Sequence, residues 1–253
     1  MPRPADIVSP IKDQMLPPKS SADEARREGR VPYQKPTPQN AVMLFIDHQI
    51  GLMAGVRDFA SLAEYKSNVV GLARTAKALR MPVLISSSNA QWQNGDTLPE
   101  IKEIFVEEPI YRRTGIINAY EDPTFRNAFE NLVTKTGRRH IIISGVTIGT
   151  CCTFPTLSML QDGYKVFPVI DACGGWNRYE TEAAMLRMAN AGAQPVTTFA
   201  LACELQADWK QLPTANDMLT PFINNLPEYG FVLQNFWNNA NQHAVPDPFG
   251  MVK

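Results

Sequence analysis

Residues 140–171 read HIIISGVTIGTCCTFPTLSMLQDGYKVFPVID, and this stretch decides the fold class. It opens with an apolar run over 140–145, continues through a helical segment closed by Gly163, and ends in a second apolar run over 164–171. Apolar runs without a polar face are typical of parallel strands that helices cover on both sides. The stretch therefore predicts a strand–helix–strand unit within a parallel sheet.

The same alternation of strand and helix continues on both sides of this unit. The further expected elements are a strand at 41–47, a helix from Ser61 to Leu79, a strand at 82–88, a helix at 123–136, a helix at 180–192, a strand at 193–199 and a helix at 200–209. Ser61 and Gly137 are typical residues for a helix start and a helix end. The pattern predicts an α/β fold: an open, mainly parallel, doubly wound sheet in a three-layer, Rossmann-type arrangement.

Two less regular segments flank a predicted domain at 41–210. Residues 1–40 hold eight of the twenty prolines and are expected to form an extended N-terminal arm. Residues 211–253 form a C-terminal extension with many aromatic side chains among Asn and Pro and no regular pattern. Aromatic residues in such a segment predict packing on the body of the protein or on a neighbouring subunit.

The composition excludes several classes of partner. The chain carries 24 Lys and Arg against 25 Asp and Glu, with no long basic stretch, so nucleic acid is not an expected partner. The longest apolar runs are strand-sized, which argues against a membrane span. The N-terminal residues lack a signal-peptide pattern, and four cysteines do not make a disulfide framework. These features predict a cytoplasmic protein.

Three features carry side chains that can take part in a reaction. Each of them follows a predicted strand or lies between two predicted strands. They are Asp47, the YRRTG segment with Arg112 and Arg113, and the GVTIGTCC turn. In an open parallel sheet, ligands bind beyond the carboxyl ends of the strands. A carboxylate, a guanidinium and a thiol at that edge can act as base, orienting cation and nucleophile. Structural roles stay open for each of them: a turn cap for Asp47, a surface ion pair for Arg113, and packing for both cysteines.

The two adjacent cysteines cannot both face one cleft. Cys151 lies near the first turn of the predicted helix, where the helix dipole favours a thiolate. Cys152 lies about 100° further round the helix axis.

The chain resembles the isochorismatase-like cysteine hydrolases, most closely their YcaC-like branch, over about residues 41–209. The matching segments are FIDHQIGLMAGVRD, RRTGIINAYEDPTF, IIISGVTIGTCCTFPTLSMLQDGYKVFPVIDACG and AGAQPVTTFALACELQADW. The resemblance implies a catalytic triad of Asp47, Arg113 and Cys151, with Cys152 packing the inner face of the helix. It also implies a homo-oligomer that acts on a small molecule without a cofactor.

The resemblance further implies how the turn would work. It places a non-proline cis peptide between Thr147 and Ile148. The backbone N–H groups of Thr147 and Cys151 would form an oxyanion hole. The implied reaction is hydrolysis of a small amide through a thioester on Cys151, with Asp47 moving the proton. Gln49, Asn118 and Trp176 are expected near the substrate pocket.

Three departures from the family pattern limit what is implied. Arg113 stands where many members have Lys, and a guanidinium cannot pass a proton. Ile148 and Gly149 replace a polar pair after the cis bond. The LISSSNAQWQNGD region lacks the histidine of the metal-binding branch, so no metal is expected. His48 follows Asp47 and is expected to be structural. Two other functions stay open: a vinyl-ether hydrolase acting on isochorismate, and a non-catalytic scaffold.

Overall fold

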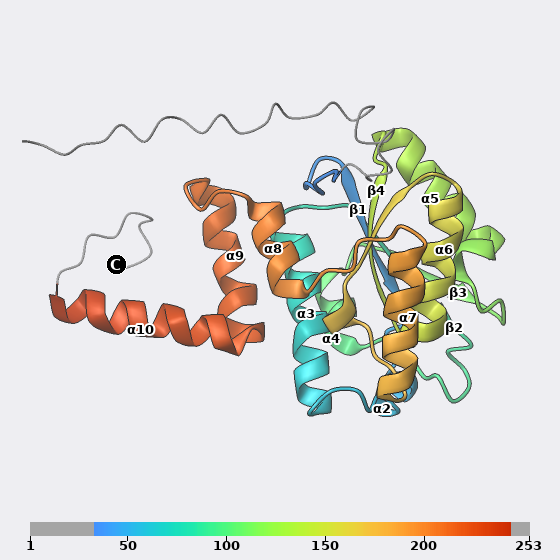
Figure 1. The fold of residues 1–253 in the computed structure, drawn as a ribbon, viewed down its shortest axis with the longest axis horizontal. Helices are drawn as coiled ribbons and strands as arrows, with labels where there is room; N and C mark the ends of the chain where they lie inside the picture. The colour runs from blue at the N-terminus through green and yellow to red at the C-terminus, as the bar shows by residue number, and fades with distance from the viewer. Residues whose placement is uncertain (1–32, 244–253) are drawn as a thin grey trace, which may run out of the picture. The chain divides into compact units, whose positions relative to one another are not determined.

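The structure, a computed structural model, describes residues 33–243. Its centre is a five-stranded parallel sheet in the order β3-β2-β1-β4-β5 (Figure 1). The strands are β1 (Ala41–Ile46), β2 (Val83–Ser88), β3 (Ile110–Arg113), β4 (His140–Gly145) and β5 (Lys165–Pro168). The predicted fold class is therefore confirmed. Most of the predicted N-terminal arm at 1–40 lies outside the described residues.

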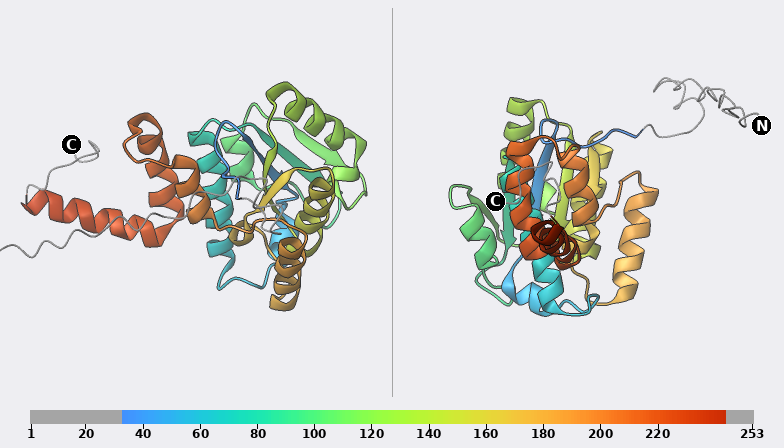
Figure 2. Two further views of the ribbon diagram at one scale, coloured as in Figure 1. Left: turned by 45° about the horizontal axis from the view of Figure 1, so that its top comes forward. Right: turned by 90° about the vertical axis from the view of Figure 1, so that its left-hand side faces the viewer.

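Helices cover both faces of the sheet, which gives three layers (Figures 1 and 2). One face carries α3 (Leu62–Ala78), α4 (Pro99–Ile104), α8 (Thr198–Gln206) and α9 (Leu212–Asn225). The other face carries α5 (Pro123–Thr136), α6 (Thr153–Gln161) and α7 (Arg178–Asn190). Short elements and a last helix complete the described chain: α2 (Ile50–Ala54), η1 (Ala119–Glu121), η2 (Ile148–Cys152), η3 (Ile170–Ala172) and α10 (Pro227–His243).

Strand β1 explains why the sheet is buried on both faces. All six of its residues are buried. Met43 and Phe45 belong to the core on the α3 face, whereas Leu44 and Ile46 belong to the core on the α5 face. Because successive side chains of a strand point to opposite faces, a strand between two helical layers needs apolar residues at every position.

Helices α3 and α5 begin and end where the sequence predicts, whereas α7 and α8 begin earlier than predicted, after the caps Asn177 and Thr197. Ser61 caps α3 by accepting a hydrogen bond from the Glu64 N–H at 3.1 Å. Asp122 caps α5 and accepts from the N–H groups of Thr124 and Phe125. Helix α5 ends at Gly137 in the left-handed conformation, with φ 68°. This conformation is one that glycine adopts without steric cost.

One predicted strand is wrong and one strand was missed. Residues 193–199 form no regular strand, although the N–H groups of Gln194 and Val196 donate to the Val166 and Pro168 carbonyls and Val196 bridges Val169. Thr197 already caps α8, so the extended segment ends at Val196. Strand β3 was missed because its sequence, IYRR, is short and half charged. A π-helical turn, η2, also precedes α6, which therefore begins only at Thr153.

The described part of the C-terminal extension, up to His243, is helical, and its first helix packs on the body of the protein. Arg74 Nη1 on α3 donates to Asn225 Oδ1 on α9 at 2.8 Å, and Ser67 Oγ donates to the Asn225 carbonyl at 3.0 Å. Helix α10 then leads away from the sheet (Figure 2). Within the described residues, none of the helices has the length and apolar character needed to cross a bilayer.

Candidate active site

The candidate site lies beside β1, where the chain reverses the direction in which it adds strands to the sheet. Strand β1 pairs with β2 on one side and with β4 on the other, so the chain winds away from β1 in both directions. Asp47 follows β1, and the β4–α6 turn (residues 145–152) follows β4. Ligands of open α/β sheets bind at this kind of switch point. Asp47 itself takes a left-handed backbone conformation, with φ 57°.

Asp47 and Arg113 form an ion pair in which both side chains are fully buried. Arg113 Nη2 donates to Asp47 Oδ2, and Ser86 Oγ donates to Asp47 Oδ1 at 3.1 Å. Arg113 Nη1 donates to the carbonyls of Ile116 and Ile117. Arg113 is therefore held from two sides and is not a surface ion-pair partner. A buried pair of this kind fixes the orientation of the carboxylate.

The structure separates the two adjacent cysteines as expected. Cys151 is partly exposed, whereas Cys152 is fully buried in the core against α5 and α7. Thr150 Oγ1 donates to Cys151 Sγ at 3.6 Å. The negative charge of Asp47, which bonds to Arg113, also acts on the thiol of Cys151.

The expected thiolate at Cys151 is not supported. Burial of the sulfur, together with the negative charge of Asp47, raises the pKa of the Cys151 thiol to about 12. The Thr150 hydrogen bond and the charge of Arg113 lower it only partly. Cys151 lies in η2, before α6 begins, so the first turn of a long helix does not surround it. The resting sulfur is therefore a thiol beside a base.

The cis peptide is present one residue earlier than expected. It joins Val146 to Thr147 rather than Thr147 to Ile148. Val146 still pairs as a strand residue, since its N–H donates to the Ile46 carbonyl at 3.2 Å and it bridges Gly174, so the turn begins directly after it. The Ile148 N–H donates to the Gly174 carbonyl at 2.8 Å. Within the described part of the chain, the Thr147 N–H has no acceptor.

Two of the three expected substrate-binding residues already have partners in the protein. The Gln49 amide donates to the carbonyls of Ser88 and Gly95, and its oxygen accepts from the Ser88 N–H. Asn118 caps η1, and its Nδ2 donates to Glu121 and Ser158. Both amides hold loops beside the site, and neither offers a free polar group to a substrate.

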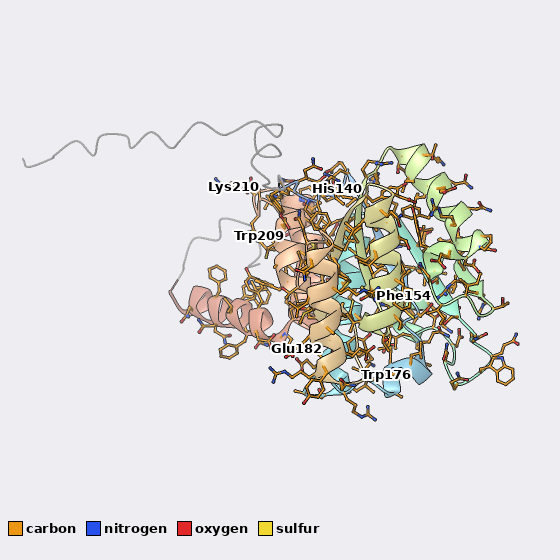
Figure 3. The ribbon with its side chains drawn as sticks, turned by 45° about the vertical axis from the view of Figure 1, so that its right-hand side comes forward. His140, Phe154, Trp176, Glu182, Trp209 and Lys210 are labelled. Carbon is orange, nitrogen blue, oxygen red and sulfur yellow. The ribbon has the colours of Figure 1, made fainter. Side chains whose placement is uncertain are left out.

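Trp176 lies at the surface at the same end of the molecule as the start of α7 (Figure 3). Its side chain is 42% exposed, and its ring packs against Gly55 so closely that a Cβ there would lie 2.2 Å from the indole. An exposed indole on a rigid loop is available as an apolar wall.

His48 is a buried structural residue, as expected. Its Nε2 lies 2.9 Å from Ser144 Oγ, and its Nδ1 lies 3.2 Å from the Tyr65 hydroxyl. Burial lowers the pKa of His48 to about 3, so the ring is neutral at physiological pH.

Sequence reasoning missed two residues that position the candidate site through hydrogen bonds. Ser86 donates to the Asp47 carboxylate, and the Gly174 carbonyl accepts from Ile148 in the β4–α6 turn. Their signals were the SSS run at the end of an apolar strand and the paired glycines of DACGG. Polar residues at a buried strand end and adjacent glycines both indicate close approach of another segment.

The chain is similar to known proteins over most of its length. The model of the isochorismatase domain matches residues 41–199. The probable hydrolase YcaC of Escherichia coli is 36% identical over 205 residues, which cover 81% of this chain and 95% of the relative. Its crystal structure, described as an octameric hydrolase of unknown specificity, superposes with a TM-score of 0.75 over 81% of this chain and 97% of that chain.

Two further relatives extend the comparison. A structure of YcaC from Pseudomonas aeruginosa with hexane-2,5-diol and covalent acrylamide is 38% identical, with a TM-score of 0.75, over 81% of this chain and 98% of that chain. Isochorismatase domain-containing protein 2 of Xenopus laevis is 25% identical over 77% of this chain and 89% of the relative.

Proposed function

The chain belongs to the isochorismatase family of hydrolases, and from this premise we propose that it cleaves the C–N bond of a small amide with Cys151 as nucleophile. The placement of Asp47 and Cys151 after the adjacent strands β1 and β4, with Asp47 paired to Arg113 and its charge acting on the thiol, carries the proposal. A thiol with a raised pKa needs a base at the moment of attack, and Asp47 is within reach to serve.

The proposed reaction has two stages. In the first, Asp47 takes the proton of the Cys151 thiol while Sγ bonds to the amide carbonyl carbon. Protonated Asp47 then gives this proton to the departing nitrogen, the C–N bond breaks, and a thioester remains on Cys151. In the second stage, Asp47 takes a proton from water, and the hydroxyl attacks the thioester. Breaking the C–S bond returns the proton to sulfur and releases a carboxylic acid.

The remaining groups act by position and charge in this proposal. Arg113 stays charged throughout and holds Asp47 toward the thiol. The Thr147 N–H, which lacks an acceptor among the described residues, is proposed to bind the tetrahedral oxyanion together with the Cys151 N–H. Trp176 is proposed as an apolar wall of the substrate pocket, while Gln49 and Asn118 hold the loops around it.

The covalent acrylamide in the Pseudomonas aeruginosa relative supports a nucleophile that a small molecule can reach in that protein. Nucleophiles add to the C=C bond of acrylamide and leave its amide intact, so the adduct bears on the nucleophile and not on the bond that is cleaved. The choice of compact amides as substrates is part of the proposal.

Release of ammonia from a panel of small amides tests the proposal. We expect turnover by the wild type, its loss in Cys151→Ala, and its retention in Cys203→Ala, since Cys203 lies on α8. Undiminished turnover by Cys151→Ala would refute the nucleophile. Release of pyruvate from isochorismate, without any release of ammonia from amides, would replace the proposal with vinyl-ether hydrolysis.

We also propose that the chain forms a homo-oligomer through the outer face of α10. The Escherichia coli relative is described as octameric. On α10, Phe231 is 72% exposed and Val232 is 55% exposed, and Glu228 is the one Asp, Glu, Lys or Arg of this helix. A surface helix with so few charges and exposed apolar residues resembles the core of a subunit contact.

A further inference from the structure

The β4–α6 turn has internal side-chain bonds, between Thr147 Oγ1 and Thr150 Oγ1 at 2.9 Å and from Thr153 Oγ1 to the Ile148 carbonyl at 2.6 Å, but its helical elements have no side-chain caps. Neither Thr147 at the start of η2 nor Cys152 at the start of α6 makes a side-chain cap. The groups proposed for catalysis on this turn must lie within a fraction of an ångström of their productive positions. Bonds within the turn and the start of α6 do not fix the turn against the rest of the protein, so another element must position it.

Residues 173–175 supply this support from one side. The Gly145 N–H donates to Cys173 Sγ at 3.3 Å, and the Ile148 N–H donates to the Gly174 carbonyl at 2.8 Å. Val146 also bridges Gly174 in parallel register. The 173–175 segment therefore contacts the turn on both sides of Thr147.

Asp58 in turn holds the 173–175 segment. Asp58 Oδ1 accepts from the Gly175 N–H at 2.9 Å, and Asp58 Oδ2 accepts from Thr181 Oγ1 at 2.6 Å. The Gly175 carbonyl accepts from the Arg57 N–H at 3.0 Å. Both backbone polar groups of Gly175 are thus bonded to residues 57–58. Bonds to an ionised carboxylate are about twice as strong as neutral ones.

Residues 173–175 pack closely against the α2–α3 connection and the start of α7. A Cβ on Gly174 would lie 2.4 Å from Val56 Cγ2, and a Cβ on Gly175 would lie 2.3 Å from Thr181 Oγ1. The α2–α3 connection therefore touches the segment directly. Asp58 is thus bonded to the segment, and the segment is bonded to the turn.

We propose that Asp58, which touches none of the reacting groups, is a positioning residue for the proposed hydrolysis, acting through residues 173–175 on the turn that carries Thr147 and Cys151. The inference rests on the proposed function. It assigns a role to a carboxylate outside the site, at the start of the path Asp58–Gly175–Gly174–Ile148.

The variants Asp58→Ala, Asp58→Asn and Thr181→Val test this role, with Asp217→Ala on α9 as the matched control. We expect Asp58→Ala to lower kcat on the amide substrate by about tenfold or more with little change in KM. Asp58→Asn keeps an oxygen for the Gly175 N–H and is expected to lose less. Thr181→Val is expected to lie between wild type and Asp58→Ala, and Asp217→Ala to match wild type.

Iodoacetamide labelling, mapped to each cysteine by mass spectrometry, separates positioning from a general loss of structure. A loosened turn lets the Cys151 sulfur leave Asp47 and meet water, so Cys151 in Asp58→Ala is expected to be labelled about threefold faster or more at pH 8. Cys152 and Cys173, both fully buried, should stay unlabelled.

Each other outcome counts against a specific claim. Labelling of Cys151 and kcat equal to wild type in Asp58→Ala would overturn the positioning role. Parallel labelling of Cys152 and Cys173 would also overturn it, because the effect would then be unfolding. Absence of amide turnover in the wild type would refute the proposed function instead, and the labelling rate of Cys151 would still decide the role of Asp58.

Discussion

At Asp47, a buried carboxylate lies between a guanidinium and a thiol, and the charges on its two sides act on the sulfur with opposite signs. The negative charge of Asp47 raises the pKa of the Cys151 thiol, and the positive charge of Arg113 lowers it. The same carboxylate that suppresses the resting thiolate is proposed to take the proton during attack. The effect of Asp47 on the resting Cys151 thiol can therefore be tested separately from the proposed role of Asp47 as the base.

The variant Asp47→Asn tests that separation. Removing the negative charge lowers the pKa of the Cys151 thiol and leaves the charge of Arg113 unopposed, so the thiolate fraction at a given pH rises. We expect faster iodoacetamide labelling of Cys151 between pH 7 and 10 than in wild type, together with loss of amide turnover. Asp217→Asn on α9 is the control. Slower labelling of Cys151, while Cys152 stays protected, would contradict the electrostatic argument.

For individual residues, the sequence predicted which side chains lie near one another better than it predicted whether Cys151 is protonated. Asp47 and Cys151 follow adjacent strands, so topology alone brings them together. The protonation of Cys151 depends on burial and on where α6 begins, and neither follows from a motif. The amide of Gln49 illustrates the same limit, because its backbone partners at Ser88 and Gly95 are distant in sequence.

Among the elements, the 173–175 segment links the start of α3 to the turn after β4 through close glycine contacts. Replacing Gly174 by Ala would bring a methyl group against Val56. Overpacking of this kind costs about 1–3 kcal/mol. We expect Gly174→Ala to reduce the free energy of unfolding by this amount in urea titrations, and Val56→Ala to restore part of the loss when combined with it.

Gly115→Ala is the matched control for that pair of variants. A Cβ at Gly115 would have no other atom within 4 Å, so the substitution is expected to leave stability near wild type. If Val56→Ala and Gly174→Ala instead destabilise additively, their contact is not the cause of the loss.

Elements with local signals were predicted accurately, and elements fixed by distant partners were not. Helix α5 matches the predicted range because Asp122, Pro123 and Gly137 mark its ends within the sequence. Strand β3 exists because Ile85 to Ser88 of β2 provide it with an edge to pair with, and nothing in IYRR itself indicates this. Residues 194–196 run beside β5, but the α8 cap at Thr197 ends this pairing after one bridge.

For the whole molecule, the alternation of apolar runs and helices was sufficient to predict three layers and the edge of the sheet that carries the site. It was not sufficient for the C-terminal extension, where the helical pattern of 211–243 is obscured by Pro and Asn. Helix α9 gains its place from contacts with α3. Helix α10 buries Leu233 on one side but leaves Phe231 and Val232 exposed on the other. The exposed side is where a second copy is proposed to bind.

The double variant Phe231→Glu, Val232→Glu tests that contact by light scattering coupled to size exclusion. One chain has a mass of 28.2 kDa, and we expect wild type at a multiple of this mass and the variant at a smaller one, because two carboxylates in an apolar contact would be desolvated without partners. Both positions are exposed in the single chain, so thermal stability of the separated protein should change little. Leu186→Glu, at an exposed leucine on α7, is the control. Dissociation by Leu186→Glu in place of the α10 pair would move the contact to α7, and a monomeric wild type would exclude the proposed assembly.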